Sequence, residues 1–403
     1  MSKTGKMILL AEALEIVEQQ LSSISLPVET IPVRQALGRT VIEDQVSSLD
    51  IPPFDKSAMD GYAIGVGDEL EEYTVIETVP AGAMPDKELT AGTAIKVMTG
   101  APVPNGTARV VMIEQTCPAN GKVRILSHSE TTNICQKGED VRAGDIILCA
   151  PAVLGPLEIS NLISTGITEV KVAKPLRISI LVTGNEIVDS PDKLEPGKIM
   201  NSNGPMLEAL CRKYLLDIVA NTIVADDRDA TVSAIREALN NTDIVVLSGG
   251  VSVGDFDFVA DAMKQVGLQL HFNRVAVKPG KPMTFASSGN KVAFGLPGNP
   301  VAVYLMFHLF VLYAARLMAG VKPELRYVTL PLASDYHRRV AERLAYLPCR
   351  LTREGLLKPI TYHGSAHLQS LWDSDGFFIV PKGVTKISAG QKVDFLILKG
   401  SFQ

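Results

Sequence analysis

The sequence lacks the features that mark several classes of protein. Its 403 residues include five cysteines, none of them in a Cys-x-x-Cys pair. This pattern gives no sign of a metal site and is typical of reduced thiols in a cytosolic protein. There is no excess of basic residues either: the formal net charge is −5, which argues against a general nucleic-acid surface. Any anionic ligand must therefore be held by a local cluster of cations.

A signal peptide and a membrane span are also not expected. Two glutamates interrupt the first apolar run, and no small-residue cleavage site follows it. Residues 301–320 reach the length of about 20 residues that a bilayer requires. However, His308 and Arg316 interrupt this segment, and Asn299 and Pro300 supply the start of a helix. We therefore favour a buried helix, in a core or a subunit interface, in a cytoplasmic protein with no membrane contact.

The pattern of apolar residues changes along the chain. From Pro27 to Ala150, strand-like pieces alternate with turn signals and indicate a β-rich region. From about Lys174 to Val321, apolar strands alternate with helices, which is typical of a parallel sheet covered on both faces. Short strands return beyond Pro323 and predict a small β-barrel or sandwich. Helices are expected over residues 7–21, 151–166, 205–214, 229–239, 258–266 and 301–320.

Four expected strands of the α/β region end in loops rich in glycine or acidic residues. These loops are Thr183–Glu186, Ala225–Asp227, Gly249–Asp255 and Pro297–Pro300. Ligands of an open parallel sheet bind at this edge, where backbone N–H groups and helix N-termini point outward. None of the loops is a Walker A motif or a Gly-x-Gly-x-x-Gly fingerprint. Each loop taken singly fits a tight turn equally well, but four loops at one edge favour a binding site.

Three cations fall within eight residues between two of the expected elements. Arg274, Lys278 and Lys281 share a segment that Pro279 and Pro282 stiffen. Such a cluster beside glycine-rich turns is suited to a phosphate or another oxyanion. The alternative is a solvated charged loop. We favour the anion site because the prolines hold the chain in one shape.

The same edge carries acidic residues, which on their own would repel an anion. They are Glu186, Asp226, Asp227, Asp255 and Asp257. Their presence is consistent with a divalent cation that bridges carboxylates and a bound anion, and Mg²⁺ favours this arrangement. Each single acid could instead cap a helix. We favour the cap for Asp255 alone and the metal site for the set.

The β-rich region contributes loops of another kind. Residues 52–63, 99–102 and 138–141 are dense in turn-forming residues, and physical reasoning alone predicts well-ordered turns there. His363 and His367 are four residues apart, which is a metal-ligand spacing on a helix. Two small residues between them disfavour a helix, so we expect surface or hydrogen-bonding histidines.

Taken together, these segments resemble the molybdopterin molybdotransferase family, the MoeA family, to which the gephyrin E domain is similar. The segments are PPFDKSAMDGYA, MTGAPVP, GEDVRAGD, LVTGNEIV, SGGVSVGDFD, VKPGKP and LPGNP, in the family's order and at its spacing. The resemblance extends over residues 7–402 and weakens after residue 331. SAMDGYA and SGGVSVGD are its most specific parts.

The resemblance implies a multi-domain α/β protein with four regions. These are an elongated linker-like domain over residues 1–45 and 146–175, an inserted mobile β-rich domain over 46–145, a molybdopterin-binding α/β domain over 176–325, and a C-terminal β-barrel domain over 326–403. The α/β domain is expected to be a three-layer, doubly wound fold with a mostly parallel sheet. Family members form elongated homodimers whose cleft is shared between subunits.

The resemblance also implies a function: insertion of molybdate into adenylylated molybdopterin, with release of AMP and formation of the molybdenum cofactor. Mg²⁺ is the implied cofactor, and transient contact with the molybdopterin adenylyltransferase is implied. The catalytic residues would be Asp60, Asp140, Asp226, Asp257, Lys278 and Lys281. The residues expected to bind the nucleotide-bearing pterin are Thr99, Thr183, Gly184, Glu186, Ser248, Gly249, Gly250, Ser252, Gly254, Arg274, Pro297, Gly298, Asn299 and Pro300. Glu186, Asp226 and Asp257 would hold the metal.

The chain departs from the family pattern at several positions. Lys56 stands where many members carry asparagine, and Asn185 replaces an acidic residue. A basic residue is often found around positions 346–349, where this chain has none, and Arg343 or Arg350 would substitute for it. Ser365 and Ser370 match serine contacts of the family.

Two other functions stay open. A molybdopterin adenylyltransferase resembles the central region alone, and the flanking regions of this chain argue against it. A non-enzymatic interaction scaffold, as some fused relatives are, carries an additional N-terminal domain and a long linker that do not occur in this sequence.

Overall fold

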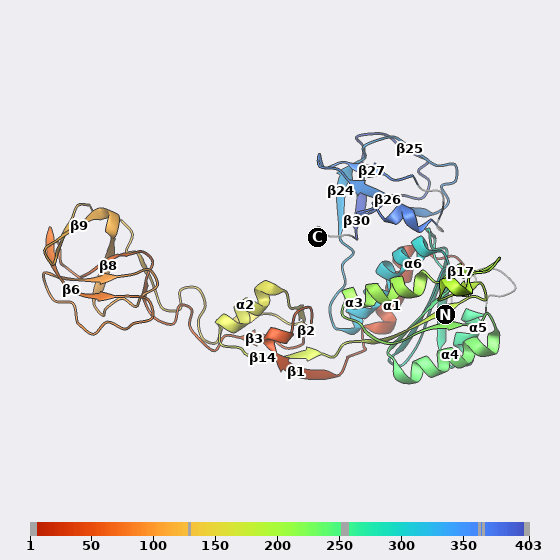
Figure 1. Cartoon of the computed structure of the whole chain (residues 1–403), viewed down its shortest axis with the longest axis horizontal. Coiled ribbons are helices and arrows are strands. Elements are labelled where there is room, and N and C mark those ends of the chain that lie inside the picture. Colours follow the sequence, from red (N-terminus) through yellow and green to blue (C-terminus); the bar gives the residue numbers. More distant parts are fainter. Residues whose placement is uncertain (1–5, 128–129, 251–257, 362–363, 365–366, 399–403) are drawn as a thin grey trace. The chain divides into compact units, whose positions relative to one another are not determined.

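The computed structural model describes residues 6–127, 130–250, 258–361, 364 and 367–398. The chain forms two compact units. The unit called here the α/β unit consists of residues 1–29, 38–40 and 172–403, and the unit called the β unit consists of residues 30–37 and 41–171. Figure 1 shows the elements of both units along the chain.

A six-stranded sheet forms the centre of the α/β unit, in the order β18-β15-β19-β23-β22-β20. The strands are β15 (Arg177–Thr183), β18 (Asp217–Val224), β19 (Ile244–Ser248), β20 (Gln269–Arg274), β22 (Pro282–Ser288) and β23 (Lys291–Leu296). The first four in spatial order run parallel, whereas β22 and β20 pair antiparallel. The parallel arrangement is thus confirmed for the four predicted strands. The sheet is mixed because β22 alone runs antiparallel to the other five strands.

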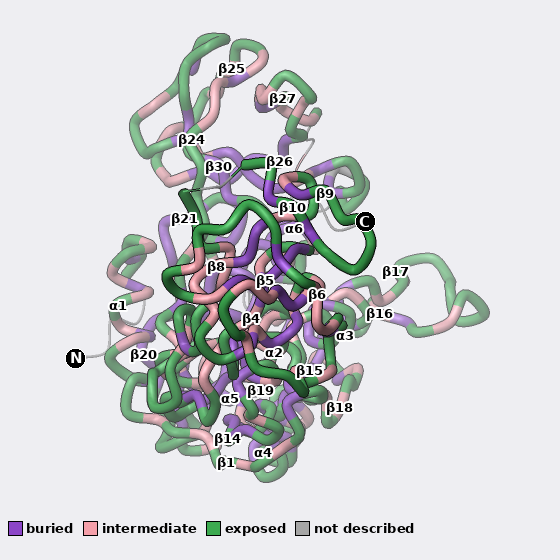
Figure 2. Tube along the Cα trace, turned by 90° about the vertical axis from the view of Figure 1, so that its left-hand side faces the viewer, coloured by how far each residue is buried: buried purple, intermediate pink, exposed green. Residues whose placement is uncertain are grey.

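Helices cover both faces of this sheet, because successive side chains of a strand point to opposite sides. In β15, Ile178 and Ile180 belong to one apolar cluster, and Leu181 belongs to another. The first cluster includes residues of α1 (Leu10–Leu21), α3 (Asn203–Lys213), α6 (Pro300–Met306) and α7 (Leu312–Met318). The second includes residues of α4 (Arg228–Asn241) and α5 (Val259–Gln265). The result is a three-layer unit with buried central strands (Figure 2).

The long apolar segment is a core helix, as predicted. By length and composition Pro300–Met318 could cross a membrane, but 83% of its most apolar window is buried inside the protein. A π-helical turn over Phe307–Val311 joins α6 and α7 and contains His308, which is 4% exposed. His308 Nδ1 lies 2.8 Å from the carbonyl oxygen of Tyr304, and Nε2 lies 3.2 Å from the Tyr214 hydroxyl. Since a carbonyl only accepts, Nδ1 carries the proton of a neutral ring. Burial lowers the pKa of His308 to about 4.

The remainder of the α/β unit is almost all strand. It contains a second six-stranded sheet, in which five strands have the order β21-β26-β28-β30-β24 and the sixth, β27, pairs with β26. The strands are β21 (Val277–Lys278), β24 (Tyr327–Pro331), β26 (Leu344–Leu351), β27 (Leu357–Pro359), β28 (Gly376–Val380) and β30 (Lys392–Ile397). A two-stranded sheet pairs β25 (Tyr336–His337) with β29 (Lys386–Ile387). One strand of the larger sheet, β21, comes from the segment predicted as a cationic loop.

The β unit contains a six-stranded sheet in the order β8-β5-β7-β6-β10-β9. The strands are β5 (Gly61–Gly65), β6 (Glu72–Val79), β7 (Thr93–Val97), β8 (Thr107–Met112), β9 (Thr116–Ala119) and β10 (Lys122–Ile125). A four-stranded sheet, β1-β14-β2-β13, is formed by β1 (Val28–Pro32), β2 (Thr40–Val41), β13 (Ala152–Val153) and β14 (Glu169–Ala173). Two further pairs of strands are short. Strand β3 (Gln45–Val46) pairs with β12 (Ile146–Leu148), and β4 (Lys56–Ser57) pairs with β11 (Ile134–Cys135).

One helix boundary differs from the prediction. Helix α2 spans Pro156–Ser164, so the predicted start at Pro151 is wrong, and residues 152–153 form strand β13 instead. Glu158 Oε2 accepts the backbone N–H of Gly155 at 2.9 Å, and Pro156 occupies the first helical position. A side-chain bond from Glu158 to the N–H of the N-cap residue, followed by a first-turn proline, defines this helix start.

The buried histidine leads to a pH-dependent stability. The ordinary pKa of 6.5 applies in the unfolded chain, whereas the folded value is about 4. As pH falls from 6.5 to 4, the unfolded state binds a proton that the folded state does not, so stability is lost in that window. We expect this loss to be smaller in His308→Gln than in the wild type, by up to about 3 kcal/mol. Urea unfolding at pH 7 and pH 4 measures this loss of stability. Equal losses in the wild type and in His308→Gln would contradict the assignment of a lowered pKa to His308.

Candidate functional site

The four loops predicted from the sequence begin at the same level, at one edge of the central sheet. Strand register pairs Thr183 with Val224, Val182 with Ser248, and Ser248 with Leu296. The loops that follow β15, β18, β19 and β23 therefore begin at the same height. This alignment places Gly184, Asp226, Gly249 and Pro297 at a single edge, where parallel-sheet proteins bind their ligands.

Close backbone approach at this edge explains its glycines. Gly249 has a φ of +97°, and a Cβ atom built there would lie 2.5 Å from the carbonyl oxygen of Thr183. A side chain would therefore clash and be strained. Gly184 has a φ of +148°, and a Cβ atom there would lie 2.8 Å from a carboxylate oxygen of Glu186. The glycines let Thr183 and Glu186 lie directly against the neighbouring backbone.

Asn203, at the start of α3, ties two of these strand ends together. Its amide nitrogen donates to Ser248 Oγ at 2.9 Å and to the carbonyl oxygen of Gly298 at 2.7 Å. Ser248 lies at the end of β19 and Gly298 in the loop after β23. The sequence did not reveal this role, because an asparagine beside a helix start is ordinarily a cap. No local pattern shows which distant strand ends it contacts.

The cationic segment reaches the same edge because β22 runs antiparallel to its neighbours. Thr284 pairs with Gly295, and Arg274 pairs with Pro282, so the connection from β20 to β22 lies beyond the end of β23. The backbone N–H of Val275 donates to the carbonyl oxygen of Lys281 at 3.0 Å and closes the segment. Lys278 and Lys281 are exposed, and Arg274 is half-buried. The predicted loop is in part a strand, since Val277 and Lys278 form β21.

The C-terminal strands hold this segment in place. Arg343 Nη1 donates to the carbonyl oxygen of Val277 at 3.1 Å. The N–H of Leu344 donates to the carbonyl oxygen of Ala276, also at 3.1 Å. Arg338 Nη1 in turn donates to the carbonyl oxygen of Arg343 at 3.0 Å. Arg343 therefore supports the strand of Lys278. Arg350, at the other end of β26, is exposed. The predicted contact Ser365 and the Ser370 side chain lie outside the described residues.

Two predicted acids lie close together at the ends of β15 and β18. Asp226 is half-buried, and burial first and the charge of Glu186 second raise its pKa above the ordinary value. Asn185 Oδ1 accepts the N–H of Asp226 at 3.0 Å, and Lys198 Nζ donates to the carbonyl oxygen of Asn185 at 2.9 Å. Asn185, where the family favours an acid, thus positions the backbone of Asp226.

A third predicted metal ligand cannot be placed beside this pair. Asp257 lies outside the described residues, as do Ser252, Gly254, Asp255 and His363. Within the residues that the structure describes, no group of three His, Cys, Asp or Glu side chains is arranged to hold a metal ion. The structure therefore brings together Glu186 and Asp226 and does not test the set of three.

In the β unit, Asp60 and Thr99 form one hydrogen-bonded pair. Asp60 Oδ1 accepts the backbone N–H of Thr99 at 2.7 Å and its hydroxyl at 2.8 Å. These bonds, the backbone one first, hold the pKa of Asp60 below its ordinary value. Two loops that are 39 residues apart in the sequence thus present one exposed, ionised carboxylate.

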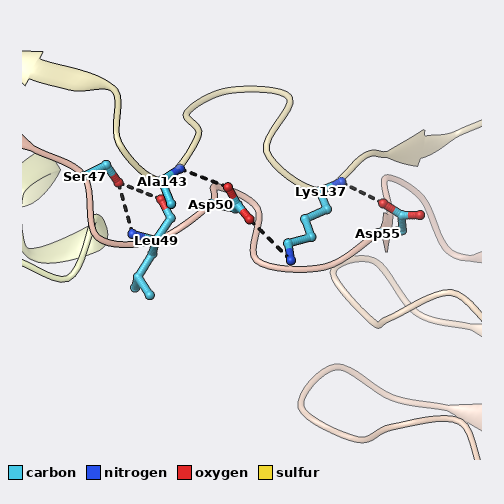
Figure 3. Close-up of polar contacts among 6 residues, drawn as sticks. All are labelled: Ser47, Leu49, Asp50, Asp55, Lys137 and Ala143. Atoms are coloured by element: carbon cyan, nitrogen blue, oxygen red, sulfur yellow. Dashed lines mark hydrogen bonds and ion pairs between the residues drawn. The ribbon is translucent and has the colours of Figure 1, made fainter.

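The loop of Asp140 is fixed by its neighbours on both sides (Figure 3). Asp50 accepts the N–H of Ala143 at 2.9 Å through Oδ1 and pairs with Lys137 Nζ at 3.3 Å through Oδ2. The N–H of Asp140 itself donates to the carbonyl oxygen of Ile51 at 3.0 Å. The Asp140 side chain is exposed. The backbone of this loop is therefore ordered, while its carboxylate faces solvent.

Comparison with known proteins agrees with the resemblance seen in the sequence. Three family models match: the MoeA N-terminal region (domain I and II) over residues 8–166, a probable molybdopterin binding domain over 179–317, and the MoeA C-terminal region (domain IV) over 329–398. A molybdopterin molybdenumtransferase of Staphylococcus aureus (strain Mu50) is 36% identical over 399 residues, 96% of this chain and 94% of the relative. One from Staphylococcus epidermidis (strain RP62A) is 33% identical over 384 residues, covering 92% of this chain and 91% of the relative.

The chain belongs to the MoeA family. Its fold agrees with this: the crystal structure of the molybdopterin biosynthesis moeA protein from Pyrococcus horikoshii OT3 matches with a TM-score of 0.84 and 31% identity, over 98% of this chain and 100% of that chain. The predicted family and the multi-domain α/β fold of MoeA proteins are confirmed. The boundaries of the four predicted regions stay a prediction.

The MoeA-family matches include both groups of candidate residues. Asp60, Thr99 and Asp140 fall in the N-terminal match, and the loops at the sheet edge fall in the central one. The C-terminal match includes Arg338 and Arg343, which support the Lys278 strand. The N-terminal match thus contains the candidate residues of the β unit, and the central and C-terminal matches contain the sheet edge of the α/β unit and the strands that support it.

The acid pair gives a testable electrostatic relation. We expect Glu186→Gln to lower the pKa of Asp226, because the variant removes a nearby like charge. The pKa should stay above its ordinary value, since burial, the larger cause, is unchanged. Asp229→Asn, a change of an exposed acid on α4, is the matched control and should leave the pKa of Asp226 in place. An NMR titration measures the pKa of the Asp226 carboxyl in both variants. The same pKa in Glu186→Gln and Asp229→Asn would contradict the electrostatic pairing of Glu186 with Asp226.

Proposed function

We propose that this chain inserts molybdenum into molybdopterin, with adenylylated molybdopterin and molybdate as substrates and AMP as a product. The observation that carries the proposal is the presence of a cationic segment and a carboxylate pair at the same edge of the α/β sheet. Membership of the MoeA family, whose curated relatives are named molybdopterin molybdenumtransferases, supports the molybdenum chemistry. The adenylate and the release of AMP are the finer part of the proposal.

Positioning and electrostatics carry the reaction in this proposal. Lys278, Lys281 and Arg274 neutralise the phosphate groups and the molybdate anion. In this proposal, a molybdate oxygen attacks the phosphorus of AMP, and the phosphoanhydride P–O bond breaks and frees the pterin phosphate. The two dithiolene thiols then bind molybdenum, AMP leaves with the attacking oxygen, and the thiol protons pass to solvent. No protein nucleophile is required, because fixed cations stabilise the charge that develops on the phosphate oxygens. The backbone bonds from Arg343 and Leu344 keep the Lys278 strand in one position and support this role.

Glu186 and Asp226 are suited to a magnesium ion. Both offer the hard oxygen ligands that Mg²⁺ prefers, and Mg²⁺ in nucleotide sites is commonly held by one or two carboxylates together with substrate phosphates. The raised pKa of Asp226 supports this use, because two adjacent carboxylates are unfavourable without a cation between them. With Asp257 as the third proposed ligand, the ion would neutralise phosphate charge when bound. Affinity for Mg²⁺ should therefore rise with pH as Asp226 loses its proton.

The β unit is proposed to complete the site. Asp60 and Asp140 are exposed carboxylates on ordered loops, and Thr99 keeps Asp60 ionised. In the proposal, these loops close over the substrate, either within one chain or from a second subunit. Water would then be excluded from the anhydride and from the molybdate.

A homodimer is the proposed assembly, in the cytoplasm, with transient contact to the adenylyltransferase that supplies the substrate. The support lies in the β unit, where Val46 of β3 and Ile146 of β12 are register partners and both are exposed. Two adjacent exposed apolar side chains favour burial against a second copy. Leu157, on α2 of the same unit, is 81% exposed.

The dimer proposal is tested by sedimentation velocity. We expect the wild-type chain to sediment as a dimer at micromolar concentration and Ile146→Glu to shift it toward monomer, because a carboxylate would be buried in the contact. Leu126→Glu, at another exposed apolar position of the β unit, is the matched control and should remain dimeric. A monomeric wild type, or two dimeric variants, would show that these residues do not form the contact.

The catalytic proposal is tested with purified protein, adenylylated molybdopterin, Mg²⁺ and molybdate. We expect AMP and active cofactor to form together in the wild type. Lys278→Ala should lower the rate at least about a hundredfold, because it removes a fixed charge from the phosphate site. Lys264→Ala removes an exposed cation of α5 that pairs with Asp261 and should leave the rate unchanged.

Three outcomes would contradict the proposal. Full activity of Lys278→Ala would remove the cationic segment from the mechanism. Consumption of ATP with unmodified molybdopterin would favour the adenylyltransferase instead. Tight binding to a receptor segment with no cofactor formed under any condition would favour the scaffold.

A further inference from the structure

Lys198 is a cation held beside the acid pair at the ends of β15 and β18. Its Nζ atom donates to the carbonyl oxygen of Asn185 at 2.9 Å. The side chain of the same asparagine accepts the backbone N–H of Asp226 at 3.0 Å, and Glu186 is the next residue along the chain. The residue that Lys198 contacts therefore connects the two acids.

Two short parallel strands bring Lys198 to this position. They are β16 (Ile187–Val188) and β17 (Ile199–Met200). The backbone N–H of Ile199 donates to the carbonyl oxygen of Glu186 at 2.7 Å. Since Ile199 directly follows Lys198, the backbone that carries the lysine is fixed against the acid pair. The long side chain therefore starts from a defined point and needs only to reach across one residue.

Within the part of the chain that the structure describes, the charge of Lys198 has no carboxylate partner at hydrogen-bond distance. The only carboxylate oxygen within 4.0 Å of Nζ is Glu195 Oε1, which lies at 4.0 Å. The carbonyl of Asn185 is neutral, and its bond uses one of the three N–H donors of the ammonium group. The side chain is 33% exposed. Two donors and the positive charge are therefore available to a ligand that carries negative charge.

The cationic segment is too distant to supply this charge. Strand β22, which Lys281 directly precedes, is three positions from β15 in the order of the central sheet. Neighbouring strands are about 4.8 Å apart, so three positions correspond to roughly 14 Å. Exposed charges that far apart are largely screened, because the Debye length is about 8 Å at physiological ionic strength. An anion at the acid pair therefore needs a nearer cation, and Lys198 is in place to provide it.

We propose that Lys198 binds a phosphate group of the substrate at the ends of β15 and β18 and holds it beside Glu186 and Asp226. The ammonium group donates to phosphate oxygens and offsets the repulsion between the phosphate and the two carboxylates. The cationic segment around Lys278 then holds a second anionic group, about three strand spacings away. This inference rests on the proposed function and adds Lys198 as a substrate-binding residue.

A purely structural role is the alternative, in which Lys198 only fastens residues 187–200 to the end of β15. The two roles depend on different properties of the side chain. Fastening requires the hydrogen bond to a neutral carbonyl group, whereas phosphate binding requires the charge. Salt screens an interaction between charges at an exposed site. The dependence of substrate affinity on salt therefore separates the two roles.

Lys198→Met removes the charge and keeps an unbranched side chain. At low ionic strength, we expect the dissociation constant for adenylylated molybdopterin to rise roughly tenfold over the wild type. At about 1 M salt, where the Debye length is about 3 Å, the ratio of the two constants should fall toward one. Lys198→Arg keeps the charge and should stay within about twofold of the wild type. Isothermal titration calorimetry measures these constants, and a thermal melt of each variant reports its folding.

Lys193→Met is the matched control. Lys193 lies in the same connection between β16 and β17, and its Nζ atom pairs with Asp189 Oδ1 at 2.8 Å. Its side chain is 63% exposed, so loss of this ion pair should leave the thermal midpoint and the substrate affinity unchanged. A normal affinity in this control shows that the effect of Lys198→Met does not arise from the net charge of the connection.

Two further ligands show which phosphate Lys198 binds. Weaker binding of AMP, as well as of the adenylate, to Lys198→Met assigns the contact to the nucleotide phosphate. Weaker binding of unmodified molybdopterin, as well as of the adenylate, assigns the contact to the pterin phosphate. Either result supports the inference.

Two results overturn the inference while AMP release by the wild type leaves the proposed function standing. One is equal affinity of the wild type and Lys198→Met for the adenylate at low ionic strength. The other is a ratio of dissociation constants that is the same at both salt concentrations, which assigns Lys198 to fastening alone. A wild type that binds no adenylate and releases no AMP overturns the proposed function, and the inference with it.

Discussion

The candidate site depends on the pairing of β21 with β26. Lys278 is on a two-residue strand, and so short a strand has little stability unless neighbouring chain fixes it. Val277 and Lys278 pair with Leu344 and Ala345, and the Arg343 side chain adds a bond to the Val277 carbonyl oxygen. The position of a cation at the sheet edge is thus set by residues more than 60 positions later in the chain. A fixed cation stabilises a developing negative charge without first reorganising, so this pairing links the C-terminal strands to the chemistry.

The acids at the edge impose a second constraint, because they oppose the anion that the cations attract. Burial first, and the charge of Glu186 second, disfavour the ionised form of Asp226 and raise its pKa. A divalent cation removes that repulsion and adds attraction for phosphate. The protein's cations and carboxylates can then bind the same ligand, provided that this ligand also coordinates the metal ion. The same reasoning explains why a net charge of −5 is compatible with a polyanionic substrate.

The sequence predicted those parts of the site that follow from local patterns. Apolar strands followed by glycine-rich or acidic loops predicted that Thr183, Asp226 and Gly249 would meet at one edge, and strand register confirms it. Long-range contacts gave no local signal. The bond from Arg343 to Val277 and the bridge made by Asn203 join residues between 45 and 95 positions apart. The start of α2 was missed for a different reason, since two prolines five residues apart offered alternative first turns.

The edge of the sheet thus divides into regions of opposite hydrogen-bonding character. The cationic segment presents donors, which in the proposed function would bind phosphate and molybdate without distinguishing one phosphate ester from another. Asn203 Oδ1 is a buried acceptor that a phosphate oxygen cannot satisfy, whereas the Thr183 hydroxyl can also donate a hydrogen bond. Lys198 lies about three strand spacings from the cationic segment and would bind a second anionic part of the same substrate. Affinity for these two parts of a substrate would therefore arise from different residues, so each can change by mutation without the other.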